Sequence, residues 1–404
     1  MVIFADLHLH SKYSRATSNQ LNFENLVKYA RIKGLNLLGT GDFTHPKHFK
    51  EIKKLEEKNG VYYYKNFPFI ITGEISLIYS QEKGRRVHLV LLVPNIETAE
   101  KVNSYLDTVG RRDYDGRPIF KLSCIEFTKK MMEISKDIEL IPAHIWTPWF
   151  GVFGSKSGFD SLKEAFGDQL ENIHAIETGL SSDPQMNWRV KEIDNVTILS
   201  FSDSHSFWPW RLGREATIFN IDENNLNYNK IISAIRQNKI AGTVEVDPAY
   251  GIYHWDGHRN CSFSCSPKET KKLNGICPIC HEPLTIGVES RVEDLAEKNR
   301  GELYKAENAK KFYKVLPLHE IISLFTGLGL SSKANWEIYN SLIEKFDDEF
   351  NILLNISEQD MLKNGIKPRI IELIIKNRNG RIKVKPGFDG VYGVAVLDEQ
   401  KRLL

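Results

Sequence analysis

Apolar runs and amphipathic stretches alternate over the first half of the chain. Runs typical of buried strands recur at residues 2–4, 70–71, 138–141 and 196–199. Between such runs, residues 23–33 and 162–166 carry apolar side chains at helical spacing. This alternation predicts repeated βα units around a parallel sheet that closes into a barrel, extending to about residue 220.

The pattern changes at about residue 243. From there to residue 290, Gly, Pro, Cys and turn residues replace the long apolar periodicity. Helical patterns separated by Gly and Asn then cover residues 317–325, 334–346, 358–363 and 368–377. We therefore predict three domains, with limits at residues 1–242, 243–290 and 291–404.

The composition is that of a globular protein. Of the 404 residues, 41% are hydrophobic and 26% are charged, which is enough to bury the cores of several domains. The chain opens without a signal-peptide pattern, and no apolar run approaches the roughly 18 residues that span a bilayer. These features predict a cytoplasmic protein that does not associate with membranes.

Histidines and carboxylates follow the predicted strands. His8 and His10 are two residues apart, so both side chains point to one face of a strand, and Asp203 and His205 share this spacing. Glu74, His88 and His144 come after or within other apolar runs. Because barrels keep their chemistry at strand ends, this set predicts a centre for two divalent ions that hydrolyses a phosphoester. Zinc suits these ligands, and Mg²⁺ or Mn²⁺ would suit exchangeable positions.

The order of these residues along the chain resembles that of the PHP (polymerase and histidinol phosphatase) superfamily. The resemblance implies a distorted (β/α)7 TIM-like barrel, with Glu74 as a carboxylate that bridges two ions and with Glu74 and Asp203 as catalytic residues. It further implies these ligand sets: His8, His10, Glu74 and Asp203 for one ion, Glu74, His88 and His144 for the second, and His205 facing a third.

The chain departs from the superfamily pattern at two positions. A Thr-Asp-His at the second strand is replaced by Gly41-Asp42-Phe43, and Arg15 stands where a histidine is often found. Asp42 or His45 would then supply the missing ligand for a third ion.

A cysteine-rich segment in the middle of the chain predicts a structural zinc module. Cys261 and Cys265 are followed, after eleven residues, by Cys277 and Cys280, a spacing typical of a closed tetrahedral four-cysteine site. A mixed site that uses His258 or His281 is the alternative. The module would either contact nucleic acid or join two domains.

A strongly basic segment lies near the C-terminus. Its only acid is Glu372, and its cations are Lys363, Lys367, Arg369, Lys376, Arg378, Arg381, Lys383 and Lys385. An ordinary solvated helix does not need this excess of positive charge, so we predict that the segment binds a DNA or RNA backbone. At the end of the chain, residues 400–404 would dock a partner such as a sliding clamp, unless they form a frayed terminus.

Two aromatic clusters follow the predicted metal ligands in sequence. They comprise Trp146 and Trp149 after His144, and Phe207, Trp208 and Trp210 after His205. These rings would stack on a nucleobase drawn out of a duplex, or else pack against the rim of the barrel.

Five stretches of the chain are far more specific than the His-x-His spacing. Together with the order of the three domains, they resemble endonuclease Q. They lie at residues 39–46, 114–118, 154–160, 253–259 and 383–393. The resemblance implies a DNA-repair endonuclease that nicks on the 5′ side of deaminated bases (uracil, hypoxanthine and xanthine) and of abasic sites. Two alternatives stay open: a metal-dependent phosphatase acting on a small phosphorylated metabolite, and a non-catalytic nucleic-acid-binding scaffold.

Overall fold

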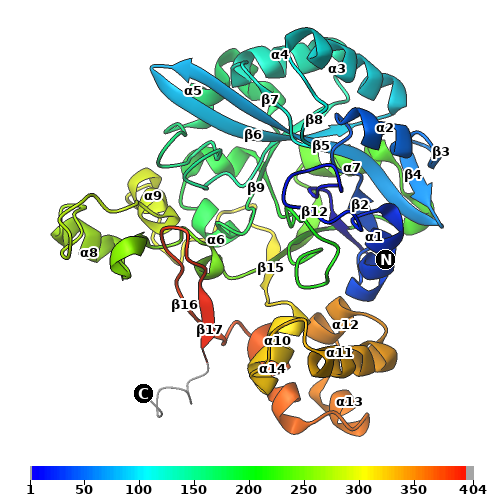
Figure 1. Cartoon of the computed structure of the whole chain (residues 1–404), viewed down its shortest axis with the longest axis vertical. Helices are drawn as coiled ribbons and strands as arrows, with labels where there is room; N and C mark the ends of the chain where they lie inside the picture. Colours follow the sequence, from blue (N-terminus) through cyan, green and yellow to red (C-terminus); the bar gives the residue numbers. More distant parts are fainter. Residues whose placement is uncertain (1, 397–404) are drawn as a thin grey trace.

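A distorted barrel forms the first half of the molecule in the computed structural model, which describes residues 2–396. β1 (Ile3–Asp6), β2 (Leu37–Gly39) and β5 (Phe67–Gln81) pair in parallel. β6 (Lys83–Val93) runs antiparallel to both β5 and β8 (Glu139–Pro142), and β9 (Ala175–Glu177) pairs in parallel with β10 (Thr197–Leu199). The Ile145 N–H donates to Glu177 O, 3.1 Å, and a bridge between Leu9 and Ser204 returns the ring to β1. The predicted (β/α)7 barrel is confirmed (Figure 1).

The expectation of a purely parallel sheet is wrong at β6. Gln81 and Lys83 face each other across the β5–β6 ladder, and Glu82 between them has a left-handed backbone with φ 62°. This tight reversal makes a long hairpin where a βα unit was predicted. Its two strands cross the upper part of the molecule in Figure 1.

Further strands extend the sheet on both sides of the barrel. β11 (Ala216–Phe219) pairs with β1, β12 (Ile240–Glu245) pairs with β11, and β15 (Lys311–Lys314) pairs with β12. At the other edge are β3 (Glu56–Lys58) and β4 (Val61–Tyr64), and β7 (Ile119–Phe120) pairs with β5.

Amphipathic helices cover the sheet. They are α1 (Phe23–Lys33), α2 (Pro46–Ile52), α3 (Ile96–Val109), α4 (Cys124–Ile134), α5 (Leu162–Phe166), α6 (Pro184–Asn187) and α7 (Tyr228–Arg236). α4 begins at a capping box, in which Ser123 and Glu126 each accept from the other's backbone N–H. Its buried face, with Phe127 and Met131, belongs to the same core as Leu89 and Leu91 of β6.

A small module follows the barrel and projects from it (Figure 1). It contains β13 (Asp256–His258), β14 (Phe263–Cys265) and α8 (Pro267–Lys272), and α9 (Val288–Leu295) leads back to the barrel. Cys265, Cys277 and Leu284 are the buried residues of its core. A core of this size contributes little stability on its own, and a bound metal ion is one of the devices that stabilise such small modules.

The C-terminal region is helical, as predicted. α10 (Leu318–Thr326), α11 (Lys333–Phe346), α13 (Glu358–Lys363) and α14 (Pro368–Arg378) lie close to the predicted ranges. α12 (Glu349–Leu354) was not predicted, because six residues are too few to show a helical period. The hairpin of β16 (Lys383–Lys385) and β17 (Val394–Val396) then lies between these helices and the small module (Figure 1).

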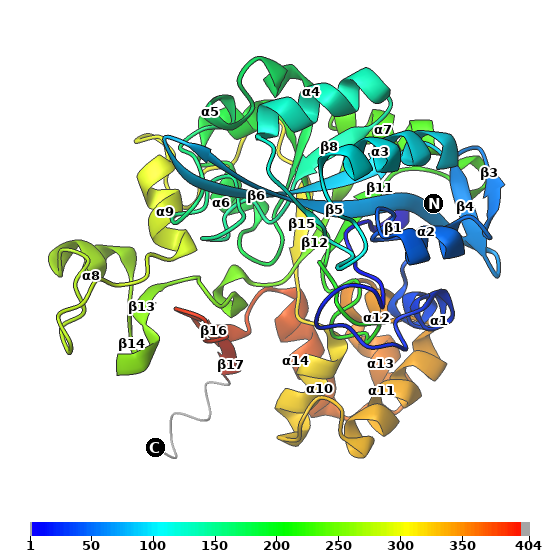
Figure 2. The same ribbon diagram turned by 45° about the horizontal axis from the view of Figure 1, so that its top comes forward.

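The first and last helical regions are in direct contact. α12 packs against α1 (Figure 2). Phe350 of α12 also stacks on Phe4 of β1, with ring centroids 4.7 Å apart. Gly34 ends α1 with φ 90°, and a Cβ there would lie 2.3 Å from Asp348 Oδ1. Only glycine fits both the backbone and this approach.

The three domain limits stay a prediction, and the predicted docking residues 400–404 lie outside the described residues. Within residues 2–396, each helix is too short or too polar to pass through a bilayer.

Candidate active site

One group of ligand atoms lies where β1 ends. His8 and His10 direct their Nε2 atoms at Asp203 Oδ1, at 3.5 and 3.0 Å. The same two Nε2 atoms lie 3.5 and 3.3 Å from Glu74 Oε2. All four ligand atoms fall within 4.8 Å of one another, a separation at which one ion can bind them together.

A second group shares Glu74 but uses its other oxygen. Glu74 Oε1 lies 2.7 Å from His88 Nδ1 and 3.3 Å from His144 Nε2. The two oxygens of one buried carboxylate therefore face two separate ligand groups. This is the geometry that a carboxylate bridging two metal ions requires.

Partners outside these groups orient the histidine rings. Glu177 Oε1 accepts from His8 Nδ1, 2.8 Å, and Asp42 Oδ1 accepts from His10 Nδ1, 3.0 Å. Carboxylates that hold the far nitrogen fix the ring and raise its basicity toward a metal. The sequence did not indicate Glu177, because its partner is 169 positions away, although its place at the end of a short apolar strand is the signal that marked the other ligands.

The residues present fit divalent metal ions. His8 Nε2 is buried and has no hydrogen-bond partner among the described residues, yet it faces two carboxylates. An orphaned buried nitrogen is costly unless an ion completes its contacts. Nitrogen and oxygen donors of this kind suit Zn²⁺, and the shared carboxylate also suits Mg²⁺ or Mn²⁺.

The backbone at the site is held in an uncommon conformation. His144, Asp203 and Asp42 all have positive φ angles, of 32°, 47° and 44°. Non-glycine residues adopt this region rarely, and such strain is concentrated at functional sites. Gly179 packs so closely on His144 that a Cβ would lie 2.4 Å from the His144 Cβ.

Charges around the centre keep its carboxylates ionised. Burial acts to raise the pKa of Glu74, but His88 and Arg117 outweigh it and hold the pKa well below its usual value. Burial acts in the same way on Asp203, and His8 and His10 hold its pKa below the usual range. Both carboxylates are thus available as anionic ligands at neutral pH.

The residues predicted to serve a third ion lie outside both groups. His205 stacks near His10, with ring centroids 4.3 Å apart, and its Nδ1 lies 3.1 Å from the backbone oxygen of Asp203. Asp42 belongs to neither ligand group, and its oxygens accept from Ser11, Ser14 and His10. Its role as a ligand for a third ion stays a prediction. His45 stacks on Tyr13.

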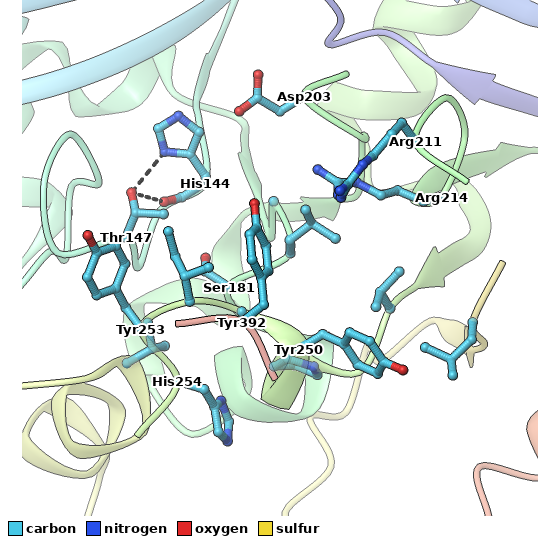
Figure 3. Close-up of a pocket in the computed structure, with 18 of the residues that line it drawn as sticks. His144, Thr147, Ser181, Asp203, Arg211, Arg214, Tyr250, Tyr253, His254 and Tyr392 are labelled. Atoms are coloured by element: carbon cyan, nitrogen blue, oxygen red, sulfur yellow. Dashed lines mark hydrogen bonds between the residues drawn. The ribbon is translucent and has the colours of Figure 1, made fainter. Parts of the chain in front are cut away.

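A cavity of about 250 Å³ opens beside the centre. Figure 3 shows Asp203 and His144 at one end and Tyr250 and His254 at the other, with Arg211 and Arg214 along one side. Tyr253 and Tyr392 also line it. These tyrosines were not among the predicted pocket residues, although Tyr253 and Tyr392 lie in two of the five stretches that resemble endonuclease Q.

Of the five predicted pocket aromatics, all within the described residues, Trp210 lines this cavity. Trp146 is fully buried in the barrel, where its Nε1 donates to Asn187, and Phe207 stacks on Tyr29. Trp208 stacks on Trp210, with ring centroids 5.3 Å apart, and Trp149 packs edge-on against Tyr253. The prediction that Trp146 and Phe207 line the base pocket is therefore wrong. Both follow a metal ligand closely in sequence, but neither lies at the cavity.

The small module brings three of its four cysteines together. The ligand atoms of Cys261, Cys277, Cys280 and His258 lie within 4.8 Å of one another. Cys265 Sγ instead lies 3.2 Å from Thr270 Oγ1 in the module's core. In this geometry the mixed Cys/His alternative replaces the four-cysteine set, and thiolates with an imidazole form a closed structural zinc site.

The basic segment is only partly available to a ligand. Lys363, Lys367, Arg381, Lys383 and Lys385 are exposed. Arg369 and Lys376 each pair with Glu372, at 2.7 Å. The prediction that Arg378 contacts a nucleic-acid backbone does not fit this structure. Its guanidinium donates to the carbonyls of residues 352, 353 and 356 and so connects α14 to α12.

Comparisons with known proteins agree with this organisation. The family model of the MJ0043 C-terminal domain matches residues 317–381. The chain is 32% identical over 298 residues to the uncharacterised protein MJ0043 of Methanocaldococcus jannaschii, a match that covers 72% of this chain and 36% of that protein. It is 24% identical over 411 residues to the uncharacterised protein YqxK of Bacillus subtilis, covering 97% and 98%. The chain thus spans about a third of the length of MJ0043 and nearly all of YqxK.

Two of the solved structures that match extend over nearly the whole chain. One is the lesion-specific endonuclease PfuEndoQ from Pyrococcus furiosus, with a TM-score of 0.87, 30% identity, and coverage of 100% of this chain and 97% of that one. The other is endonuclease Q in complex with a 27-mer duplex substrate with an abasic lesion at the active site, with a TM-score of 0.88, 30% identity, and coverage of 99% and 98%. The chain belongs to the endonuclease Q family of metal-dependent DNA endonucleases.

Proposed function

We propose that this protein is a DNA-repair endonuclease that cuts the phosphodiester bond 5′ to a deaminated base (uracil, hypoxanthine or xanthine) or to an abasic site. One observation carries the proposal: Glu74 joins two ligand groups, and a cavity opens at their side that shares Asp203 and His144 with them. Hydrolysis and recognition of one nucleotide can therefore occur within a single site. The full-length likeness to endonuclease Q bound to an abasic duplex supports it.

The chain's own residues would prepare this site for hydrolysis. When bound, two divalent ions would supply a water of lowered pKa and positive charge for the leaving oxygen. Glu74 and Asp203 would hold them, together with the histidines of the two groups. Glu177 and Asp42 keep the His8 and His10 rings in the orientation that directs Nε2 inward. The structural zinc would bind in the small module.

Recognition of the lesion would use the cavity. Aromatic rings of Trp210, Tyr253 and Tyr392 line it and offer faces on which a base drawn out of the duplex can stack. Arg211 and Arg214 add positive charge beside them, and the exposed lysines of the basic segment would bind the DNA backbone. A sliding-clamp partner and a cytoplasmic location stay predictions.

The test uses labelled duplexes with one uracil, hypoxanthine, xanthine or abasic site, or no lesion. They are incubated with Mg²⁺, Mn²⁺ or Zn²⁺, and with EDTA as a control. We expect a metal-dependent nick 5′ to each lesion and none in the undamaged duplex. Asp203→Asn should abolish the nick and leave DNA binding intact, whereas Asp168→Asn, at an exposed position, should cut like the wild type. Release of phosphate from small phosphomonoesters without any nick would favour a phosphatase.

A further inference from the structure

An arginine outside both ligand groups reaches the bridging carboxylate. Arg117 Nη1 lies 3.1 Å from Glu74 Oε2. The Glu74 side chain is 0% exposed, whereas that of Arg117 is 29% exposed. Among residues 2–396, the other ion-pair partners of Glu74 are the histidines of the two groups. The guanidinium therefore touches the centre with one edge and remains partly open to solvent.

The segment around Arg117 is fixed on several sides. A Cβ on Gly116 would lie 2.1 Å from both Asp42 Oδ2 and Ser14 Oγ, so only glycine permits this approach. Asp115 Oδ1 accepts from the Arg117 N–H, 3.2 Å, and Pro118 O accepts from the Ser76 N–H, 3.0 Å. The backbone thus places the arginine at the centre, and its side chain stays partly exposed there.

The charge of Arg117 has a second use once cations bind. Burial opposes a charge there, but Glu74, Asp203 and Asp115 attract the guanidinium, which no change of pH in the working range can neutralise. Two divalent ions that share the oxygens of Glu74 would compete with this attraction. A phosphodiester arriving at the same centre supplies two non-bridging oxygens, and a guanidinium binds such oxygens in a planar, two-pronged geometry.

We propose that Arg117 binds the phosphodiester that is cut and stabilises the negative charge that develops on its non-bridging oxygens. The inference rests on the proposed endonuclease function, and it adds a catalytic residue to the ligand sets. The competing interpretation is that Arg117 only positions Glu74 through the ion pair. The two interpretations differ in what Arg117 touches during the reaction, so they can be separated.

The first experiment compares Arg117→Met with Arg117→Lys and with Arg111→Met as the matched control. Arg111 belongs to the same loop, is exposed and pairs with Asp113. Under single-turnover conditions on an abasic duplex, we expect Arg117→Met to lower the cleavage rate about 100-fold. Arg117→Lys should recover part of the lost cleavage rate, and Arg111→Met should keep the wild-type rate. Bound metal, measured by elemental analysis, should be equal in all four proteins; loss of metal in Arg117→Met would support the positioning role instead.

The second experiment places a methylphosphonate, which lacks one non-bridging charge, at the position that is cut. It should slow the wild type strongly and slow Arg117→Met much less, because the partner of that oxygen is already gone. Equal slowing of both proteins would overturn the proposal. If Arg117→Met does not fold, Arg117→Lys enters the same comparison.

A substrate without a lesion separates the two proposals. Hydrolysis of bis(p-nitrophenyl) phosphate needs the metal centre but no lesion recognition. If the wild type cuts no lesion duplex but hydrolyses this diester, the endonuclease function fails while Arg117→Met still tests the phosphate contact. If Arg117→Met hydrolyses the diester as fast as the wild type, the proposal that Arg117 binds the phosphate is overturned.

Discussion

Lys33 and Glu349 form a buried ion pair that joins the barrel to the helical region. Lys33 Nζ lies 2.6 Å from Glu349 Oε1, and the side chains are 1% and 0% exposed. Lys33 also donates to Pro209 O, 2.8 Å, in the segment between Asp203 and Trp210. The pair therefore connects α1, α12 and the chain that leads from the metal centre to the cavity.

Replacing Lys33 with Met removes the cation and leaves the carboxylate of Glu349 buried. Glu349 keeps two donors, the Leu318 N–H and the Tyr339 hydroxyl, both at 2.9 Å. These donors do not neutralise a full charge, so we expect Lys33→Met to lower the free energy of unfolding by about 3–5 kcal/mol. Lys33→Met combined with Glu349→Gln should recover most of this loss, because the amide still accepts hydrogen bonds and carries no charge.

Urea unfolding followed by tryptophan fluorescence measures the effect. Lys28→Met is the control, because Lys28 lies on the same helix but is exposed, and it should change the free energy of unfolding by no more than about 0.5 kcal/mol. The reasoning is refuted if Lys33→Met costs less than about 1 kcal/mol, or if the double variant is no more stable than the single one.

Two further predictions concern the aromatic cluster and the zinc module. His319 lies among the rings of Trp210, Trp336 and Tyr339, and burial there lowers its pKa to about 3. Below about pH 6.5 the unfolded chain therefore binds a proton that the folded chain does not, and stability falls as the pH drops from 6.5 towards 3. His319→Phe should be about 1–3 kcal/mol more stable at pH 7, because neither buried ring nitrogen of His319 has a hydrogen-bond partner within residues 2–396. The variant should also lose less stability than the wild type between pH 7 and pH 5, as measured by urea titrations at both pH values; a parallel pH dependence of the two proteins would contradict the assignment. In the module, Cys277→Ser should lose the structural zinc while Cys265→Ser keeps it, as measured by zinc content after dialysis; loss in both variants would restore the four-cysteine set.

The sequence predicted what local spacing determines. His8, His10 and Asp203 follow strands, and the period of two residues decides which way a strand side chain points. The helices of the C-terminal region show the same dependence on local periodicity. Glu177 and Arg117 reach the centre through contacts between distant parts of the chain, and no local pattern carries that information. The reversal of the chain at Glu82 depends on the left-handed backbone of this one residue. The residues beside it in the sequence did not predict that conformation.

The aromatic residues show why proximity in sequence misleads at a cavity. Trp146 follows a metal ligand by two positions yet points into the core, whereas Tyr392 follows His144 by more than half the chain and lines the cavity. Tyr392 arrives there because the C-terminal segment folds back on residues 249–255: the Trp255 N–H donates to Gly387 O, 2.9 Å, and a Cβ on Gly393 would lie 2.0 Å from Ala249 O. Glycine is required for so close a packing of two backbones. The two ligand groups are thus built within the barrel, but the cavity beside them is completed by the C-terminal segment. A change in that segment would alter the cavity while leaving the ligand groups in place.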